Sequence, residues 1–165
     1  MKHSKPSPRG AHAERAGTRP PRITTLSDAE CQALLTRHSV GRMAHTFHDR
    51  VDITPIHYIY ADPWLFARTS HGAKTTILAH SRWVAFEVDE IEGVFDWRSV
   101  VVHGAAYPMP RDGTPLDVEH WSRGIELLRR IVPATGTDDD PVPYRDLVFG
   151  IHVDSMTGRA STTRD

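Results

Sequence analysis

A short polar stretch, Arg68 to Lys74, carries residue types that suit a phosphate group. It offers the hydroxyls of Thr69 and Ser70, the flexible Gly72 and the ammonium of Lys74. Backbone N–H groups at a helix start, together with hydroxyls and one cation, suit a phosphomonoester dianion. Lys74 is also the only lysine beyond residue 22, although arginine is common there. An ordinary solvent-exposed turn explains the same residues equally well, so spacing alone leaves both interpretations open.

A second candidate surface lies on a predicted strand, Trp97 to Gly104. Side chains alternate along a strand, so Trp97, Ser99, Val101 and His103 share one face. An indole and a hydroxyl beside a β-branched wall could line a planar heteroaromatic ligand. For an isolated strand, however, plain core packing of the tryptophan and the valines is the favoured interpretation.

The segment Pro55–Tyr58 offers backbone atoms rather than side-chain chemistry. A proline removes one donor from a sheet ladder and is therefore confined to an edge strand or a bulge. We expect backbone groups near Pro55 to be available to a ligand.

Other catalytic patterns are missing from the sequence. There is no G-x-G-x-x-G, and the order Gly72-Ala73-Lys74-Thr75 does not match a P-loop, so ATP hydrolysis is not supported. With one cysteine and no H-E-x-x-H, no metal site is predicted. No G-x-S-x-G marks a nucleophilic serine. Among the 11 histidines, His71 and His103 are the candidates for proton transfer or substrate contact.

Composition points to one folded domain with an N-terminal extension. The 165 residues are 39% hydrophobic and 25% charged, which suits a single core of ordinary size. Residues 1–22 carry six basic residues and one acidic residue, a formal charge of +5, and the other residues carry −6. The extension has almost no apolar content, so we expect disorder over 1–22 and a domain over 23–165.

The same composition bears on partners and location. A basic extension can contact nucleic acid, but a solubilising role is favoured over nucleic-acid binding. No apolar run is long enough for a membrane span and no secretory signal is visible, so a cytoplasmic protein is expected. The single Cys31 agrees with a reducing compartment.

Periodicity predicts strands in succession with a few helices. Ser27 and Glu30 form a capping-box pattern, which starts a predicted helix. Apolar residues at helical spacing from Trp121 to Val132 predict a second amphipathic helix. The expected helices therefore cover 28–38, 75–80 and the region around 121–132; the expected strands cover 40–47, 51–60, 64–69, 83–89, 97–107 and 147–154.

This order favours antiparallel pairing in a mainly β fold: a six-stranded antiparallel β-barrel with peripheral helices. A barrel of this size is just filled by its own side chains. Any cofactor must therefore sit on the outer wall, and burying it there needs a second surface, most simply another copy of the chain.

The sequence resembles the pyridoxamine 5′-phosphate oxidase-like, FMN-binding split-barrel family from about residue 26 to about residue 161. The matching pieces are L-S-D-A-E at 26–30, V-G-R-M-A at 40–44, P-I-H-Y at 55–58, F-A-R-T-S-H-G-A-K at 66–74, V-A-F-E-V-D at 84–89, W-R-S-V-V-V-H-G at 97–104 and M-T-G-R at 156–159. Each piece is weak alone, but their order and spacing together are fairly specific.

The resemblance implies a split barrel and a cofactor-binding homodimer. It implies FMN, with its phosphate held in the stretch that begins at Arg68 and its ring beside residues 56–58 and beneath residues of the partner subunit. The implied cofactor-binding residues are Arg68, Thr69, Ser70, Gly72, Ala73 and Lys74 for the phosphate, Ile56, His57 and Tyr58 along the ring, and Trp97 and Ser99 from the partner.

The same resemblance implies an FMN-dependent oxidoreductase that moves electrons between a nicotinamide donor and a small organic acceptor. The C-terminal residues 152–159 lack the arginine-and-histidine substrate motif of the true oxidases, so relatives of the flavin reductase type fit better. The alternative is a non-catalytic protein that binds or sequesters a flavin, the deazaflavin coenzyme F420 or haem.

Overall fold

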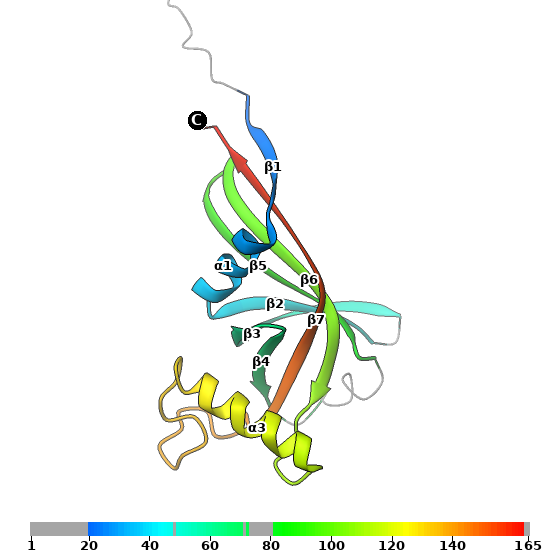
Figure 1. Cartoon of the computed structure of the whole chain (residues 1–165), viewed down its shortest axis with the longest axis vertical. Coiled ribbons are helices and arrows are strands. Elements are labelled where there is room, and N and C mark those ends of the chain that lie inside the picture. Colours follow the sequence, from blue (N-terminus) through cyan, green and yellow to red (C-terminus); the bar gives the residue numbers. More distant parts are fainter. Residues whose placement is uncertain (1–19, 48, 71, 73–80, 164–165) are drawn as a thin grey trace, which may run out of the picture.

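The computed structural model of the chain describes residues 20–47, 49–70, 72 and 81–163. Strands dominate the described residues, and two helices lie against them (Figure 1). The elements are β1 (Arg22–Leu26), α1 (Asp28–Arg37), β2 (Val40–Phe47), β3 (Arg50–Ala61), β4 (Trp64–Thr69), β5 (Trp83–Gly93), β6 (Asp96–Pro108), α3 (Pro115–Leu128) and β7 (Leu147–Thr162). The helix predicted over 75–80 lies outside the described residues.

The strands form one antiparallel sheet that closes on itself. Its order is β1-β7-β4-β3-β2-β5-β6, and an additional pairing of β6 with β7 closes the ring. Strand β1 joins the sheet only along the C-terminal part of β7, from Leu26 opposite Gly158 to Arg22 opposite Thr162. The mainly β, antiparallel barrel is confirmed, but the predicted number of six strands is wrong because β1 brings the strands of the described residues to seven.

The largest departures from the predicted strands occur at β7 and β1, where pairing rather than local composition extends the sheet. Strand β7 continues to Thr162 instead of ending at Asp154, since its polar second half pairs with both β6 and β1. Strand β1 begins at Arg22, upstream of the first element that the sequence predicts, because it pairs there with β7.

The ring interior is filled by side chains. Strand residues alternate between this interior and the exterior, as the burial of β5 shows along Trp83–Gly93. The fully buried residues include three aromatic rings from three strands, and they leave no space for a large ligand. These core residues include Tyr58, Phe86, Phe149, Leu34, Leu35, Met43, Leu65, Val88, Val100, Val102 and Ile151.

Helix α1 packs against this core through one face. Its predicted capping box is present, with the Ser27 hydroxyl accepting from the Glu30 N–H and the Glu30 carboxylate accepting from the Ser27 N–H. At its other end the carbonyl oxygen of Leu35 accepts a 2.7 Å hydrogen bond from the buried Tyr58 hydroxyl. The helix ends at Arg37, with His38 as its C-cap, one residue earlier than predicted.

Helix α3 covers the exterior of the ring at the end of the molecule opposite β1 (Figure 1). A second apolar cluster fills the space between this helix and β4 and β7, with Phe66, Ile125 and Val148 among its members. Thr114 caps the helix through a second capping box with Asp117. The helix ends at Leu128, so the predicted extension towards residue 132 is wrong: that residue belongs to the connection that follows.

Candidate functional site

The stretch predicted to bind phosphate, Arg68 to Lys74, begins with the last two residues of β4 and continues beyond that strand. Thr69 is the last residue of β4 and is buried, Ser70 is half-buried, and Gly72 is exposed with a φ of 141°. That φ is one that residues with a Cβ rarely adopt, so Gly72 has a conformational reason to be glycine. Residues 71, 73 and 74, which include the predicted His71, Ala73 and Lys74, lie outside the described residues.

The structure gives Arg68 a specific partner. Its guanidinium forms a two-pronged ion pair with Asp140, in which NH2 donates to Oδ1 at 2.9 Å and NH1 donates to Oδ2. The two side chains are only 9% and 3% exposed. This arginine lies on the α3 side of the sheet, with Phe66 two residues earlier on the same face. A phosphate-binding role for Arg68 would have to compete with this ion pair.

The proline on β3 lies at an edge among the described strands, as predicted. Pro55 is opposite Arg42 on β2, whereas the pairing of β3 with β4 begins only at Tyr58. Of the three residues expected along a ring, Ile56 and Tyr58 point into the core and only His57 has an exposed side chain. An exterior ligand could therefore reach Ile56 and Tyr58 through backbone atoms only. Burial also raises the pKa of the Tyr58 hydroxyl.

The predicted face of β6 points outward. Trp97, Ser99 and Val101 are half-buried and His103 is exposed, while the valines between them fill the core. We call the exterior face of β2, β3, β5 and β6 the outer wall. Directly paired residues share a face, so one row across it holds Ile53, Ala44, Ala85 and His103.

The next row of the outer wall carries a charged network. Pro55, Arg42, Glu87 and Val101 are paired in turn across the four strands. Arg42 NH1 donates to Asp89 Oδ1 at 2.7 Å and to Glu87 Oε2 at 3.0 Å. These hydrogen bonds with Asp89 and then Glu87 raise the pKa of Arg42.

Ser99 belongs to the same network. Its hydroxyl donates a 3.1 Å hydrogen bond to Glu87 Oε1, so one carboxylate connects Arg42 with Ser99. Arg42 and Glu87 are 45 residues apart, and only the pairing of β2 with β5 brings them together.

Exposed apolar residues lie beside this network. A pocket of about 260 Å³ is lined here by Ala44, His45, Thr46, Val51, Trp83, Val84, Ala85 and His103. Val51 and Ile53 on β3 and Trp83 on β5 are 69%, 67% and 68% exposed, which is unusual for three large apolar residues on the two strands that flank β2. The outer wall therefore combines a polar network with a surface that a ligand or a protein partner would bury.

Comparison with known proteins agrees with this fold. Residues 27–160, most of the chain, match the model of the pyridoxamine 5′-phosphate oxidase family. The chain belongs to this family. Among the described residues, no helix has the length and apolar character that crossing a membrane would need.

Two solved structures share the split-barrel architecture of this chain, and one further relative is similar in sequence. An FAD-binding protein from Mesorhizobium loti is 27% identical, with a TM-score of 0.65 over 87% of this chain and 99% of its own. An FAD-binding protein from Mycobacterium smegmatis is 26% identical, with a TM-score of 0.60 over 84% of this chain and 98% of its own. An uncharacterized protein of Rhizobium meliloti is 26% identical over 84% of this chain and 95% of its own length.

Proposed function

We propose that this member of the pyridoxamine 5′-phosphate oxidase family is a flavin-dependent oxidoreductase. Two copies would enclose FMN against the outer wall, and electrons would pass between a nicotinamide donor and a small organic acceptor. Support comes from the two FAD-binding proteins that resemble the chain over more than four-fifths of its length. Their cofactor makes a flavin the expected class, and FMN is our narrower choice.

The filled interior of the ring is the observation that supports an exterior site for the cofactor. Because three buried aromatic rings and the aliphatic core occupy the interior, a tricyclic cofactor has to bind on the exterior. The outer wall fits this requirement. It has an open strand edge at Pro55, a hydroxyl on Ser99 and apolar surface at Val51 and Trp83.

Each of these groups has a defined task in the proposal. The open edge near Pro55 offers backbone N–H and carbonyl groups to the polar rim of the ring. The hydroxyl of Ser70, the ammonium of Lys74 and the N–H groups of the stretch that ends there hold the phosphate. Glu87 accepts a hydrogen bond from the Ser99 hydroxyl, so the Ser99 oxygen is oriented to accept a hydrogen bond from elsewhere. The covering copy excludes water. When bound, a flavin supplies hydride and single-electron chemistry that protein side chains lack.

The absorption spectrum of the purified full-length protein tests the cofactor class. We expect a flavin spectrum, and chromatography of the released cofactor should give FMN. Release of FAD would keep the flavin and refute the choice of FMN, whereas a deazaflavin or haem spectrum would refute the flavin itself. Anaerobic addition of NADPH should then bleach the flavin. A flavin that stays oxidised with every nicotinamide donor would indicate a carrier rather than an enzyme.

Two further measurements test the site. Lys74→Ala should lose most of its flavin after gel filtration, while Lys5→Ala, which removes the same charge from the N-terminal segment, should keep it. Equal flavin content in both variants would contradict the role given to Lys74. The molar mass of the flavin-loaded protein should be that of a dimer, and a monomer with bound flavin would refute the proposed covering by a second copy.

A further inference from the structure

A second pocket lies elsewhere on the exterior of the ring, beside β4 and β7 and away from the outer wall. It has a volume of about 620 Å³, within the range of small-molecule sites. Helix α3, the connection that follows it and the strands β4 and β7 surround it. Its lining residues are Arg68, Met109, Pro110, Arg111, Asp112, Trp121, Ile125, Arg129, Gly136, Thr137, Asp140, Pro143, Arg145, Asp146, Leu147 and Val148. We call it the α3 pocket.

The α3 pocket is lined by four arginines and three aspartates, and three of the arginines come from separate segments. Arg111 precedes α3, Arg129 follows it, and Arg145 precedes β7. None of these three forms an ion pair with any carboxylate in the described part of the chain. Arg111 instead lies 5.3 Å from the ring centre of Trp121, and Arg145 lies 6.0 Å from that of Tyr144. Their guanidinium groups retain donors for an anion.

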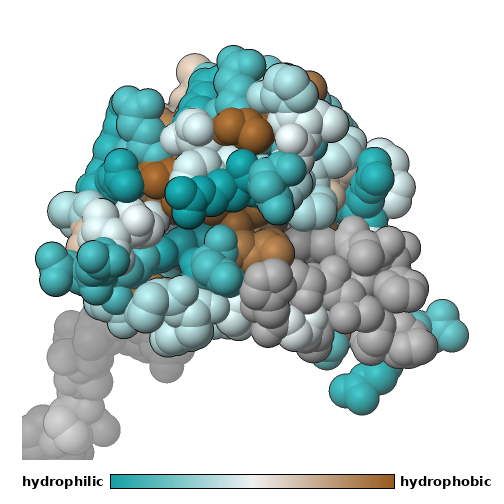
Figure 2. Space-filling view, turned by 90° about the horizontal axis from the view of Figure 1, so that it is seen from below, coloured by the Kyte–Doolittle hydropathy of each residue, from teal (hydrophilic) through white to brown (hydrophobic). Residues whose placement is uncertain are grey.

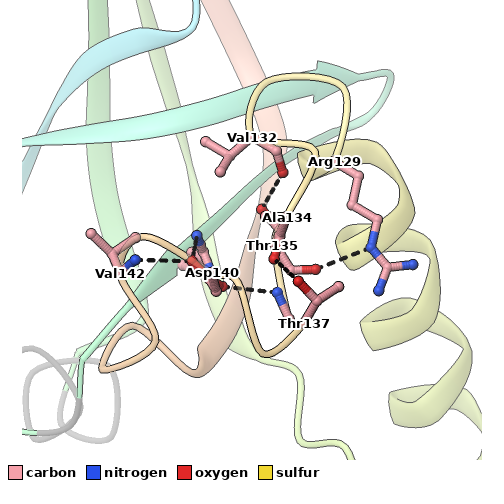
Figure 3. Close-up of polar contacts among 9 residues, drawn as sticks. Arg129, Val132, Ala134, Thr135, Thr137, Asp140 and Val142 are labelled. Carbon is pink, nitrogen blue, oxygen red and sulfur yellow. Dashed lines mark hydrogen bonds and ion pairs between the residues drawn. The ribbon is translucent and has the colours of Figure 1, made fainter.

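The wall of the pocket is built in advance of any ligand. Asp140 neutralises Arg68 and also accepts hydrogen bonds from the N–H groups of Gly136 and Val142, at 2.8 and 3.0 Å. Arg129 Nε donates to the carbonyl oxygen of Thr135 at 3.0 Å, which ties the connection to α3 (Figure 3). Preorganised walls lower the cost of ordering on binding.

The remaining surface of the pocket is apolar. Met109, Trp121, Ile125 and Val148 belong to or pack against the cluster beneath α3, and they also line the pocket. Figure 2 views the molecule from this end and shows small apolar areas among mainly hydrophilic side chains. A ligand that satisfies both kinds of lining needs an anionic group and a flat or apolar body.

We propose that the α3 pocket binds a nucleoside monophosphate or a closely similar aromatic phosphate. Its phosphate would lie among Arg111, Arg129 and Arg145, and its base would lie against Trp121. The exposed Asp112 in the lining favours a nucleotide over inorganic phosphate. Its carboxylate can accept hydrogen bonds from sugar hydroxyls, whereas it would repel an anion that carries no hydroxyl donors. This site lies on the exterior of β4 and β7, apart from the outer wall that β2, β3, β5 and β6 form.

Binding of AMP, adenosine and inorganic phosphate to the full-length protein, already saturated with its flavin, tests the proposal. Titration calorimetry should show one AMP per chain, with adenosine and phosphate each at least tenfold weaker. Arg111→Gln should weaken AMP about tenfold, because one charge-assisted hydrogen-bonding group is lost. Arg130→Gln is the matched control: it removes the same charge from an exposed neighbour of Arg129 that does not line the pocket, and it should leave AMP binding within twofold.

Arg145→Gln provides a second variant in case Arg111→Gln does not fold, and it should weaken AMP similarly. The absence of AMP binding would overturn the proposal, as would adenosine binding as tightly as AMP, since the arginines would then play no part. Equal weakening by Arg130→Gln and by the pocket variants would also overturn it, because general electrostatic attraction would be the cause. None of these outcomes alters the flavin assignment, which is tested by the spectrum.

Discussion

Replacing Asp140 by Asn should destabilise the protein more than any other single change of charge in the connection after α3. The substitution keeps the shape but removes the charge that faces Arg68, and it leaves a buried guanidinium without its anion. Breaking a buried ion pair costs about 3 to 5 kcal/mol. Both residues also line the α3 pocket, where solvent can partly screen the guanidinium left without its anion, so we expect the lower end, about 3 kcal/mol.

Urea unfolding at pH 7 measures this loss, and Asp139→Asn is its control because Asp139 is an exposed neighbour with the same charge. For a domain of this size, a loss of about 3 kcal/mol lowers Tm by about 6 to 12 °C. Asp139→Asn should change the free energy of unfolding by no more than about 0.5 kcal/mol. If the two variants are equally stable, Arg68 and Asp140 do not hold the connection against β4.

The pH dependence gives an independent check of the same ion pair. Arg68, helped by the N–H groups of Gly136 and Val142, holds the pKa of Asp140 well below its usual range. A carboxyl group with a lowered folded-state pKa adds stability above its unfolded pKa of about 3.9 and loses it as the pH falls towards the folded value. The stability gap between the parent and Asp140→Asn should therefore be constant from pH 7 to about 5 and narrow below about 4. A gap that stays constant down to the acid transition would contradict this explanation.

Three further substitutions and one control probe the fold by urea unfolding. Gly104→Ala should cost at least about 2 kcal/mol, because its Cβ would lie 2.0 Å from a backbone carbonyl oxygen, whereas Gly93→Ala, whose Cβ would meet nothing closer than 3.9 Å, should be nearly neutral. Tyr58→Phe should cost about 1 kcal/mol by leaving the buried carbonyl of Leu35 without its donor. Thr114→Ala should cost about 1 kcal/mol by removing the N-cap of α3. A neutral result for either of the last two variants would show that solvent replaces the lost partner.

The parts of the fold that were predictable are those whose signals are local. The capping box at Ser27 and the alternation along the central strands are encoded within a few residues, and both predictions are confirmed. Strand β1 was missed because its residues are nearly all exposed and show no alternation, so only pairing with β7 makes it a strand. The second half of β7 was missed for the same reason: it is mostly polar, and only its pairing with β6 and β1 makes it a strand. The start of α3 at Thr114-Pro115 had a local signal, a capping residue followed by proline, that could have been recognised.

The candidate site also has features that the local sequence could predict and features that depend on contacts between distant segments. Alternation already places His57 on the opposite face from Ile56 and Tyr58, so the sequence could have shown that only one of the three side chains reaches the exterior. The link from Arg42 through Glu87 to Ser99 could not have been found, because it depends on the register of two separate strand pairings. The partner of Arg68 is 72 residues away in an irregular connection, where no periodicity indicates contacts.

Because the ring is filled, the two proposed ligands have to bind at two different exterior surfaces. Since the interior admits no large ligand, binding residues can come only from outward-facing positions, and the sheet offers two such regions with different chemistry. The outer wall has an open strand edge, hydroxyl and carboxylate groups and exposed apolar residues, which suit a ring covered by a second copy. The side beneath α3 has arginines around an apolar pocket, which suits a phosphate that one chain can hold alone. Dilution that dissociates the proposed dimer should therefore release the flavin while leaving AMP affinity unchanged, and simultaneous loss of both ligands would show that the two surfaces are not independent.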